Sequence, residues 1–544
     1  MNRRARTISR GAMYDAATSS PLNHDVAVVV GYTKARNTKL AAVLATAGLT
    51  AALALSGCAG QTSETSNEQA SSQATSSLVS SAASSSTASE NASVTPTASS
   101  PKVITEADIT INETYEDTSD GGHAIQVDAQ SAEYSNVGVT KTGEADGDEA
   151  DFYGENAAIF ATNGGTLDIA QAVIKTNGTH ANAIFSYGEG TTVNVSDAVI
   201  ETTGNCSGGL MTTGGGTMNA TNLNITTSGN SSAAIRSDRG GGTVNVVGGS
   251  YATSGMGSPA IYSTADITVS DAALSSTSAQ GVVVEGKNSV TLNNVDLTAS
   301  NTSKNSDKSE YYQAVMIYQS MSGDAAQGEA SFTMNGGTLT NLNGDIFFVN
   351  NTVATINLDN ATITNQADGV LLRAAAAGWG SEGSNGGQVT LRASNQQLEG
   401  DMLVDAVSHL NLYLSSGSTY SGAINPDGAE GDVYVEVEEG SRWVLTGDSY
   451  ITGLTCGTDA IDLNGHTLYV NGEAYTQGSA SQGEAIEAQV SAGGMGGGMG
   501  EPPSGAPGEG GEGGAGGAGG TPPEKPGEGA GGVGSASGTP PEKP

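Results

Sequence analysis

The sequence has few aromatic residues, few basic residues and few cysteines. Aromatic side chains make up 5% of the 544 residues, and 20 Lys and Arg stand against 57 Asp and Glu, giving a formal net charge of −37. This balance argues against nucleic acid as a partner, because its phosphates need a basic surface. The 3 cysteines show no metal-binding spacing. Beside 78 glycines, the shortage of bulky side chains favours a fold with many tight turns.

A short pattern of aliphatic residues recurs about every 23–26 residues. Two apolar residues stand two positions apart, so they project from the same side of a β-strand, and a third follows after a polar break. Asn, Asp and Gly at the break suit a tight bend, because they tolerate a left-handed backbone. The instances are Leu167/Ile169/Ile174, Val193/Val195/Ile200, Met218/Ala220/Ile225, Val244/Val246/Tyr251, Ile267/Val269/Leu274, Val290/Leu292/Leu297, Phe332/Met334/Leu339 and Ile356/Leu358/Ile363.

A repeat this short cannot close a hydrophobic core alone, so its copies must stack on one another. Each repeat holds three short strands and three turns, which predicts an all-β fold. The expected architecture is a right-handed parallel β-helix solenoid, with ladders of like side chains about 4.8 Å apart. A leucine-rich repeat would need its Leu/Asn signature, and a propeller blade would be about forty residues long. Neither pattern is present.

The amino end carries a basic flank, an apolar run over residues 40–55 and the box Leu55-Ser56-Gly57-Cys58. In this order the three elements resemble a bacterial lipoprotein signal. The resemblance implies cleavage before Cys58, lipidation of its thiol and a lipid-anchored position on the extracellular face of the bacterial cell membrane. A short transmembrane anchor is the alternative, although the run is short for about 30 Å of hydrocarbon.

Composition divides the chain into four segments. Residues 1–57 are expected to be the signal peptide, and the Ser/Thr-rich residues 58–102 a disordered tether. Residues 103–475 carry the repeats and are expected to form the β-helix with its caps. The Gly/Pro/Glu-rich residues 476–544 are expected to be a disordered tail.

One strand of each repeat offers a candidate ligand-binding strip. Its aliphatic residue should face inward, so the next residue should face outward on consecutive turns of the solenoid. Aromatic side chains in such a strip suit the apolar faces of sugar rings. The alternative is that the strip packs under a loop or fills the core. The outward candidates are Phe160, Phe185, Met211, Arg236 and Tyr262.

Two insertions, residues 301–328 and 374–388, interrupt the rhythm of the repeats. Insertions in repeat proteins often form the binding face. The alternative is that their aromatic rings pack on the flank of the solenoid. The aromatic candidates in these insertions are Tyr311, Tyr312, Tyr318 and Trp379.

A run of carboxylates offers oxygen ligands for calcium, which takes about six to eight of them. Its spacing fits no EF-hand, and a solvated loop is the alternative. The run comprises Glu144, Asp146, Asp148 and Asp151. Calcium is the one candidate cofactor.

No catalytic motif is visible, and we assign no catalytic residue. The histidines, His180 among them, stand alone, with no motif that recruits a Ser or Cys nucleophile. Cys206 is expected in or beside the stacked core. Arg236, Asp238 and Arg239 form the one compact group of basic and acidic residues.

The repeat over residues 120–475 resembles right-handed parallel β-helix proteins, a group that includes pectate-lyase-like enzymes and non-catalytic bacterial surface adhesins. The resemblance rests on repeat geometry. It implies an adhesin-like protein, anchored in the membrane through its lipid, that binds a polysaccharide or a host or neighbouring-cell surface glycoprotein. An extracellular polysaccharide lyase or glycoside hydrolase is one alternative, and a passive spacer in the cell envelope is another.

Overall fold

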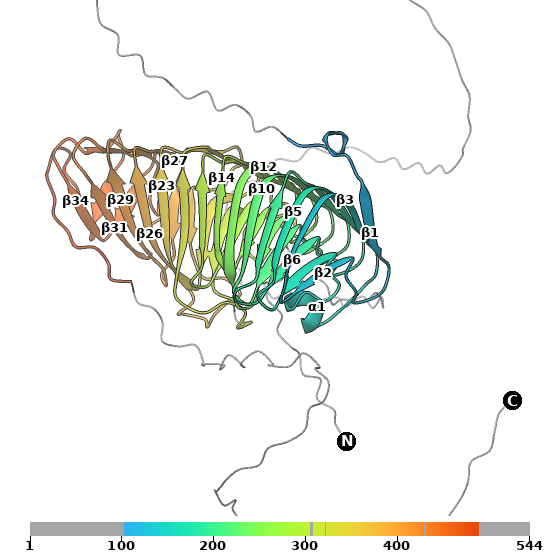
Figure 1. Cartoon of the computed structure of the whole chain (residues 1–544). Coiled ribbons are helices and arrows are strands. Elements are labelled where there is room, and N and C mark those ends of the chain that lie inside the picture. Colours follow the sequence, from blue (N-terminus) through green and yellow to red (C-terminus); the bar gives the residue numbers. More distant parts are fainter. Residues whose placement is uncertain (1–102, 305–307, 321, 429, 489–544) are drawn as a thin grey trace, which may run out of the picture. The chain divides into compact units, whose positions relative to one another are not determined.

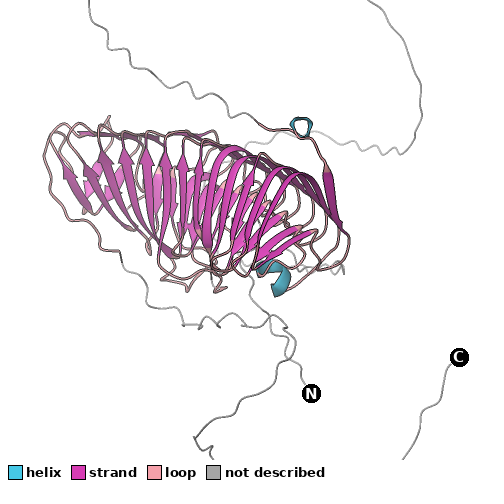
Figure 2. Ribbon diagram, viewed as in Figure 1, coloured by secondary structure: helices cyan, strands magenta, loops and turns pink. Residues whose placement is uncertain are grey.

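The computed structural model describes residues 103–488, apart from residues 305–307, 321 and 429. The described residues form parallel strands stacked turn upon turn in two long sheets (Figure 1, Figure 2). The parallel β-helix predicted from the repeat is confirmed. The predicted signal peptide, Cys58 and the tether lie outside the described residues, as does the tail from residue 489 onward.

The larger sheet has 19 strands. They are β1 (Glu113–Asp117), β3 (Ser131–Lys141), β5 (Thr166–Thr176), β7 (Thr192–Ser196), β8 (Val199–Thr202), β10 (Gly216–Thr227), β12 (Gly242–Thr253), β14 (Asp266–Ser270), β15 (Ala273–Ser276), β17 (Ser289–Asn293), β18 (Asp296–Ala299), β20 (Glu329–Asn335), β21 (Thr338–Asn341), β23 (Thr352–Asp359), β24 (Thr362–Asn365), β26 (Gly387–Ser394), β29 (His409–Ser415), β31 (Asp432–Val437) and β34 (Gly453–Cys456).

The second long sheet has 11 strands and carries the predicted ligand-binding strip. They are β2 (Ile125–Asp128), β4 (Ile159–Thr162), β6 (Ile184–Tyr187), β9 (Leu210–Thr213), β11 (Ile235–Ser237), β13 (Ile261–Ser263), β16 (Val282–Glu285), β19 (Gln313–Tyr318), β22 (Asp345–Asn350), β25 (Leu372–Ala374) and β28 (Met402–Val404).

Two small sheets and two short helices complete the described fold. The small sheets contain β27 (Gln397–Glu399), β30 (Thr419–Ser421), β32 (Arg442–Val444) and β35 (Ile461–Asp462), and β33 (Ser449–Ile451), β36 (Leu468–Val470) and β37 (Glu473–Ala474). The helices are η1 (Glu106–Asp108) and α1 (Asp148–Phe152).

The apolar positions of the repeat stack in register through the larger sheet. Leu167 pairs with Val193, Val193 with Met218 and Met218 with Val244, and all four side chains are buried. Each turn therefore covers the apolar side of the turn before it, which is how short strands share one long core.

The polar breaks form the predicted bends between strands. Asp197, Asn222, Asp271 and Asn294 adopt left-handed backbone angles, with φ between 48° and 54°. Their side chains also join neighbouring turns, because Asn222 Nδ2 donates to Asp197 Oδ1 at 2.5 Å and Asn294 Nδ2 donates to Asp271 Oδ1 at 2.7 Å. The bends thus satisfy the backbone requirement and add a polar ladder.

The segment after the last strand also belongs to the folded domain. Asn411 Nδ2 in β29 donates to the carbonyl oxygen of Ile486 at 2.8 Å, and the amide of Ile486 donates to Asn411 Oδ1 at 2.9 Å. Ser481 forms an antiparallel bridge with Cys456 at the end of β34. The ordered structure therefore extends past residue 475, where composition places the boundary.

Candidate functional site

The outer face of the 11-stranded sheet carries one continuous column of side chains. Ile159 and its equivalents in the following strands belong to the core inside the solenoid, so the next residue in each strand points away from that core. The register confirms the sequence-based order of this outward column. Its members are Phe160, Phe185, Met211, Arg236, Tyr262, Val283, Met316, Phe348, Arg373 and Leu403.

The prediction that the first part of this column is an exposed strip is wrong. Phe160 is 8% exposed, Phe185 0%, Arg236 1% and Tyr262 2%. These side chains lie under chain segments that pack on the outside of the sheet, as the alternative interpretation proposed. They contribute to packing and offer no open surface for a sugar ring.

The segments that pack on the outside of the 11-stranded sheet are called the cover, and helix α1 and the first insertion, residues 301–328, form part of it. The Thr213 hydroxyl at the end of β9 donates to the carbonyl oxygen of Phe152 at 2.7 Å. The Arg239 guanidinium lies 3.8 Å from the centroid of the Phe152 ring and also pairs with Asp324 of the insertion, with Nη2 2.9 Å from Oδ1. One arginine thus links both covering segments to the sheet.

Of the four aromatic residues predicted in the two insertions, two are buried and two are partly exposed. Tyr318 and Trp379 are each 1% exposed, and their rings pack edge to face with centroids 5.1 Å apart. They are not accessible for binding, in agreement with the alternative of flank packing. Tyr311 and Tyr312 are only partly buried, and Lys304 Nζ lies 5.5 Å from the Tyr312 ring centroid.

A buried polar cluster lies beneath the first insertion. Tyr318 donates its hydroxyl to Glu285 Oε2 at 3.0 Å, and Tyr262 donates to the same oxygen. Burial raises the pKa of the Glu285 carboxyl above its usual range, and it raises the pKa of the Tyr262 hydroxyl well above 10.0. Nearby, Arg236 Nη2 lies 3.1 Å from Asp238 Oδ2. These groups bind one another on the outer face of the sheet.

The outer face opens where the cover ends, at β25 and β28. A pocket of about 190 Å³ lies there, and Arg373 of the outward column forms part of its wall. Tyr311 is the one predicted aromatic candidate that lines it. The remaining polar side chains of the pocket are Asp405, Asn425, Asp427 and Glu430.

Arg373 and Tyr311 form a fixed pair within this pocket. Arg373 Nε donates to Asp345 Oδ2 at 2.6 Å, and its guanidinium carbon lies 4.3 Å from the centroid of the Tyr311 ring. Phe348 packs on Tyr311 with ring centroids 5.2 Å apart. Burial raises the pKa of the Tyr311 hydroxyl, so Tyr311 remains a neutral hydrogen-bonding group at physiological pH.

Carboxylates dominate the charge of the pocket. Asp405 is held by the Ser408 hydroxyl, which donates to Oδ1 at 2.6 Å, and by the amide of Ala376, which donates to Oδ2 at 2.8 Å. Asp427 and Glu430 are exposed at the rim. Because Asp345 already neutralises Arg373, the pocket presents hydrogen-bond acceptors and net negative charge.

The predicted calcium run does not gather at one point. Asp148 Oδ2 lies 3.4 Å from Arg239 Nη1, whereas Asp151 turns inward and places Oδ1 3.0 Å from His180 Nδ1. Asp146 is exposed at the surface with Oδ1 3.8 Å from His180 Nε2. The amide of Glu144 donates to Oδ1 of Asp120, in a different segment, at 2.9 Å. The run is therefore divided between several partners.

Two groups of residues were not among the predicted site residues. Arg373 could have been found, because it is the register partner of Phe348 and so belongs to the outward column. Asp427 and Glu430 approach Tyr311 from a distant loop, and no repeat spacing predicts that approach. His180, expected to stand alone, lies 26 residues before Cys206, a separation that equals one repeat.

Comparison of the chain with protein-family models, with curated proteins and with solved structures found no match. No helix among residues 103–488 has the length and hydropathy needed to span a membrane.

Proposed function

We propose that the chain is a surface β-helix protein that binds glycans at the pocket lined by Tyr311 and Arg373. The observation that carries this proposal is the opening of the outward column at β25, directly beside a partly buried tyrosine and several carboxylates. Binding sites of this kind combine an apolar surface with a few fixed polar groups. Tyr311, Leu403 and Val404 supply apolar surface, and Asp405 supplies a fixed acceptor.

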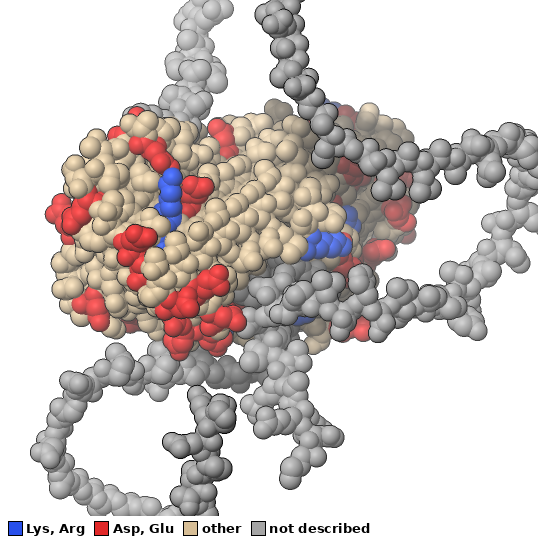
Figure 3. All heavy atoms as spheres, turned by 90° about the vertical axis from the view of Figure 1, so that its right-hand side faces the viewer, with Lys and Arg blue, Asp and Glu red and all other residues tan. Residues whose placement is uncertain are grey.

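The charge of the pocket favours a neutral glycan over an acidic one. A carboxylate accepts hydrogen bonds from sugar hydroxyls, but it repels a uronate or a sulfate. Acidic side chains are also scattered over the face seen in Figure 3, with few basic ones between them. A polyanionic chain would meet repulsion along much of that surface.

The amino-terminal segments supply the proposed location. Residues 1–57 resemble a lipoprotein signal, so lipidation of Cys58 would anchor the chain at the outside of the membrane. The tether over residues 58–102 would hold the solenoid away from the lipid surface. Together with the repeat geometry, these features favour the adhesin-like members of the parallel β-helix group.

The test uses the chain from residue 58 onward, with Cys58→Ser to remove the need for lipid. Neutral and acidic polysaccharides are incubated with the protein, and both retained polysaccharide and new chain ends are measured. We expect retention of a neutral glycan, with Tyr311→Ala weakening binding at least 10-fold. New reducing or unsaturated ends would show an enzyme instead.

A second tyrosine provides the matched control. Tyr413 in β29 has the Arg392 guanidinium 4.3 Å from its ring centroid, the same separation as in the Tyr311 pair, but neither residue lines the pocket. Tyr413→Ala should leave binding unchanged. Equal losses in both variants would contradict the assignment of the pocket.

A further inference from the structure

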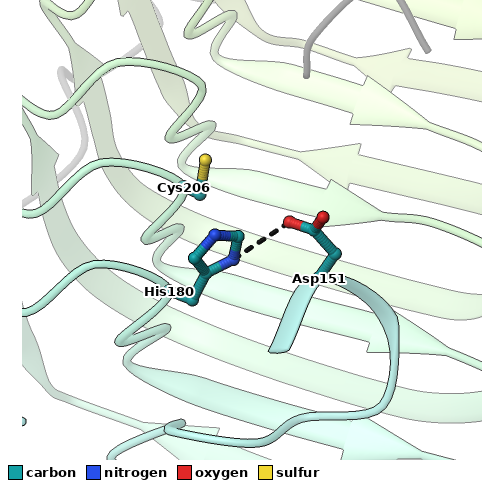
Figure 4. A group of neighbouring side chains, drawn as sticks. All are labelled: Asp151, His180 and Cys206. Carbon is teal, nitrogen blue, oxygen red and sulfur yellow. Dashed lines mark ion pairs between the residues drawn. The ribbon is translucent and has the colours of Figure 1, made fainter. Parts of the chain in front are cut away.

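Three buried side chains of different chemistry meet beside α1. Asp151, His180 and Cys206 each place one potential ligand atom within 4.8 Å of the others (Figure 4). Their exposed fractions are 2%, 3% and 1%. The pocket proposed to bind glycans involves none of the three, so the group calls for a separate explanation.

The repeat itself brings His180 and Cys206 together. Both occupy the same bend in consecutive turns of the solenoid, with left-handed φ values of 57° and 54°. The amide of His180 donates to the carbonyl oxygen of Asn205 at 2.9 Å, which fixes the two bends one above the other. Equivalent residues on neighbouring turns are about 4.8 Å apart, so the two side chains meet.

Asp151 reaches this pair from α1 and has no ordinary hydrogen bond to it. Its Oδ1 lies 3.0 Å from His180 Nδ1, yet neither atom has a partner in hydrogen-bond geometry among the described residues. The two atoms form a buried ion pair outside hydrogen-bond geometry, and the cost of burying both groups is offset only when the geometry is good. A metal ion held by both atoms would provide that geometry and neutralise the carboxylate.

We propose that Asp151, His180 and Cys206 form a binding site for a divalent transition-metal ion of the zinc type. Thiolate sulfur, imidazole nitrogen and carboxylate oxygen are the ligands that zinc takes in proteins, at about 2.0–2.3 Å. Calcium prefers oxygen ligands only, so it does not suit this group. Three protein ligands leave the fourth tetrahedral position for a water molecule.

A nearby carboxylate completes the site from outside. Asp146 Oδ1 lies 3.8 Å from His180 Nε2, the ring nitrogen that does not face Asp151. In metal sites the second nitrogen of a ligating histidine commonly donates to a carboxylate, which orients the ring. At 3.8 Å the two atoms are an ion-pair contact longer than a hydrogen bond, and a small movement of the exposed Asp146 side chain would make it a positioning residue. The ion would attach α1, and with it the edge of the cover, to two turns of the solenoid.

The test uses the chain from residue 58 onward with Cys58→Ser, so that Cys206 and Cys456 are the remaining thiols. Zinc content is measured after dialysis against zinc, and cobalt is added to the metal-free protein as a spectroscopic probe. We expect one zinc per chain and a near-ultraviolet band from thiolate-to-cobalt charge transfer. Absence of both would overturn the proposal.

Variants assign the ligands. Cys206→Ser should abolish the charge-transfer band, whereas Cys456→Ser should keep it, because the Cys456 sulfur lies against the Tyr475 hydroxyl and the Ser479 carbonyl, at 3.9 and 3.8 Å, away from Asp151 and His180. Asp146→Asn should weaken zinc binding about 10-fold, as expected for an outer-shell partner. A band that survives Cys206→Ser would place the ion elsewhere.

Two further variants keep the test decisive if Cys206→Ser fails to fold. His180→Gln and Asp151→Asn retain the thiol and should weaken zinc binding more than about 100-fold, beyond the range of an outer-shell change. Circular dichroism of the metal-free variants verifies that each keeps its strands. Unchanged zinc affinity in both folded variants would refute the ligand set.

Discussion

Removing one partner of the buried pair Arg236 and Asp238 should cost far more stability than breaking a shorter pair at the surface. Both side chains are 1% exposed, and Arg236 Nη2 lies 3.1 Å from Asp238 Oδ2. At an effective dielectric constant of about 20, this separation gives an attraction of about 5 kcal/mol. Arg236→Met removes that attraction and leaves a carboxylate under the cover, which should cost about 3–5 kcal/mol.

The pair between Arg442 and Asp462 is the matched control. Its atoms approach to 2.5 Å, but the side chains are 54% and 29% exposed. Water and salt screen such a pair, so Arg442→Met should cost at most about 1 kcal/mol. If contact distance alone decided the energy, Arg442→Met would lose more stability than Arg236→Met.

The assay is urea unfolding followed by circular dichroism, with thermal midpoints as a second measure. The double variant Arg236→Met with Asp238→Leu should recover most of the lost stability, because no unpaired charge remains buried. Equal losses in Arg236→Met and Arg442→Met would refute the burial argument. A double variant as unstable as Arg236→Met would show that the loss comes from packing.

Two other predictions concern the pH dependence and the turns. Burial raises the folded pKa of Glu285 above its reference of 4.5, so its contribution to stability is present below that pH and is lost as pH rises through the folded value. Glu285→Gln should therefore raise the thermal midpoint at pH 7 and change it little at pH 4; a lower midpoint at pH 7 would contradict this. In the stacked turns, a Cβ at Gly229 would lie 1.8 Å from the carbonyl oxygen of Gly204, whereas one at Gly457 would meet nothing within 4 Å. Gly229→Ala should lower stability by more than about 3 kcal/mol and Gly457→Ala by less than about 0.5 kcal/mol, and similar urea midpoints for the two would disprove the clash.

The parts of the fold that repeat were predictable because their cause is local. The two-residue spacing of Val193 and Val195 sets one face of a strand, and the bend at Asp197 needs a residue that accepts positive φ. Stacking then follows, since no single turn can bury its own apolar side. The same alternation correctly predicts that the side chains of Phe160 and Arg236 face away from the core, but it does not predict which segments pack over them.

The cover and the pocket could not be predicted from the period, because their residues come from segments that do not repeat. Asp324 reaches Arg239 from the first insertion, and Asp427 reaches the Tyr311 pocket from a later loop. Contacts of this kind depend on how each loop folds back on the sheet. His180 and Cys206 are different, since counting one repeat along the chain would have paired them.

The chemical character of the outward column itself indicates where the cover ends. From Tyr262 through Val283, Met316 and Phe348 the column is continuously apolar or aromatic, and every one of these side chains is buried. Such a run left open would form a contiguous apolar patch, which soluble surfaces rarely carry unless a partner covers it. The next member, Arg373, breaks the run, and the pocket opens there. In this solenoid the apolar run from Tyr262 to Phe348 is covered and the pocket begins directly after it, whereas the earlier charged member Arg236 stays buried because Asp238 pairs with it under the cover.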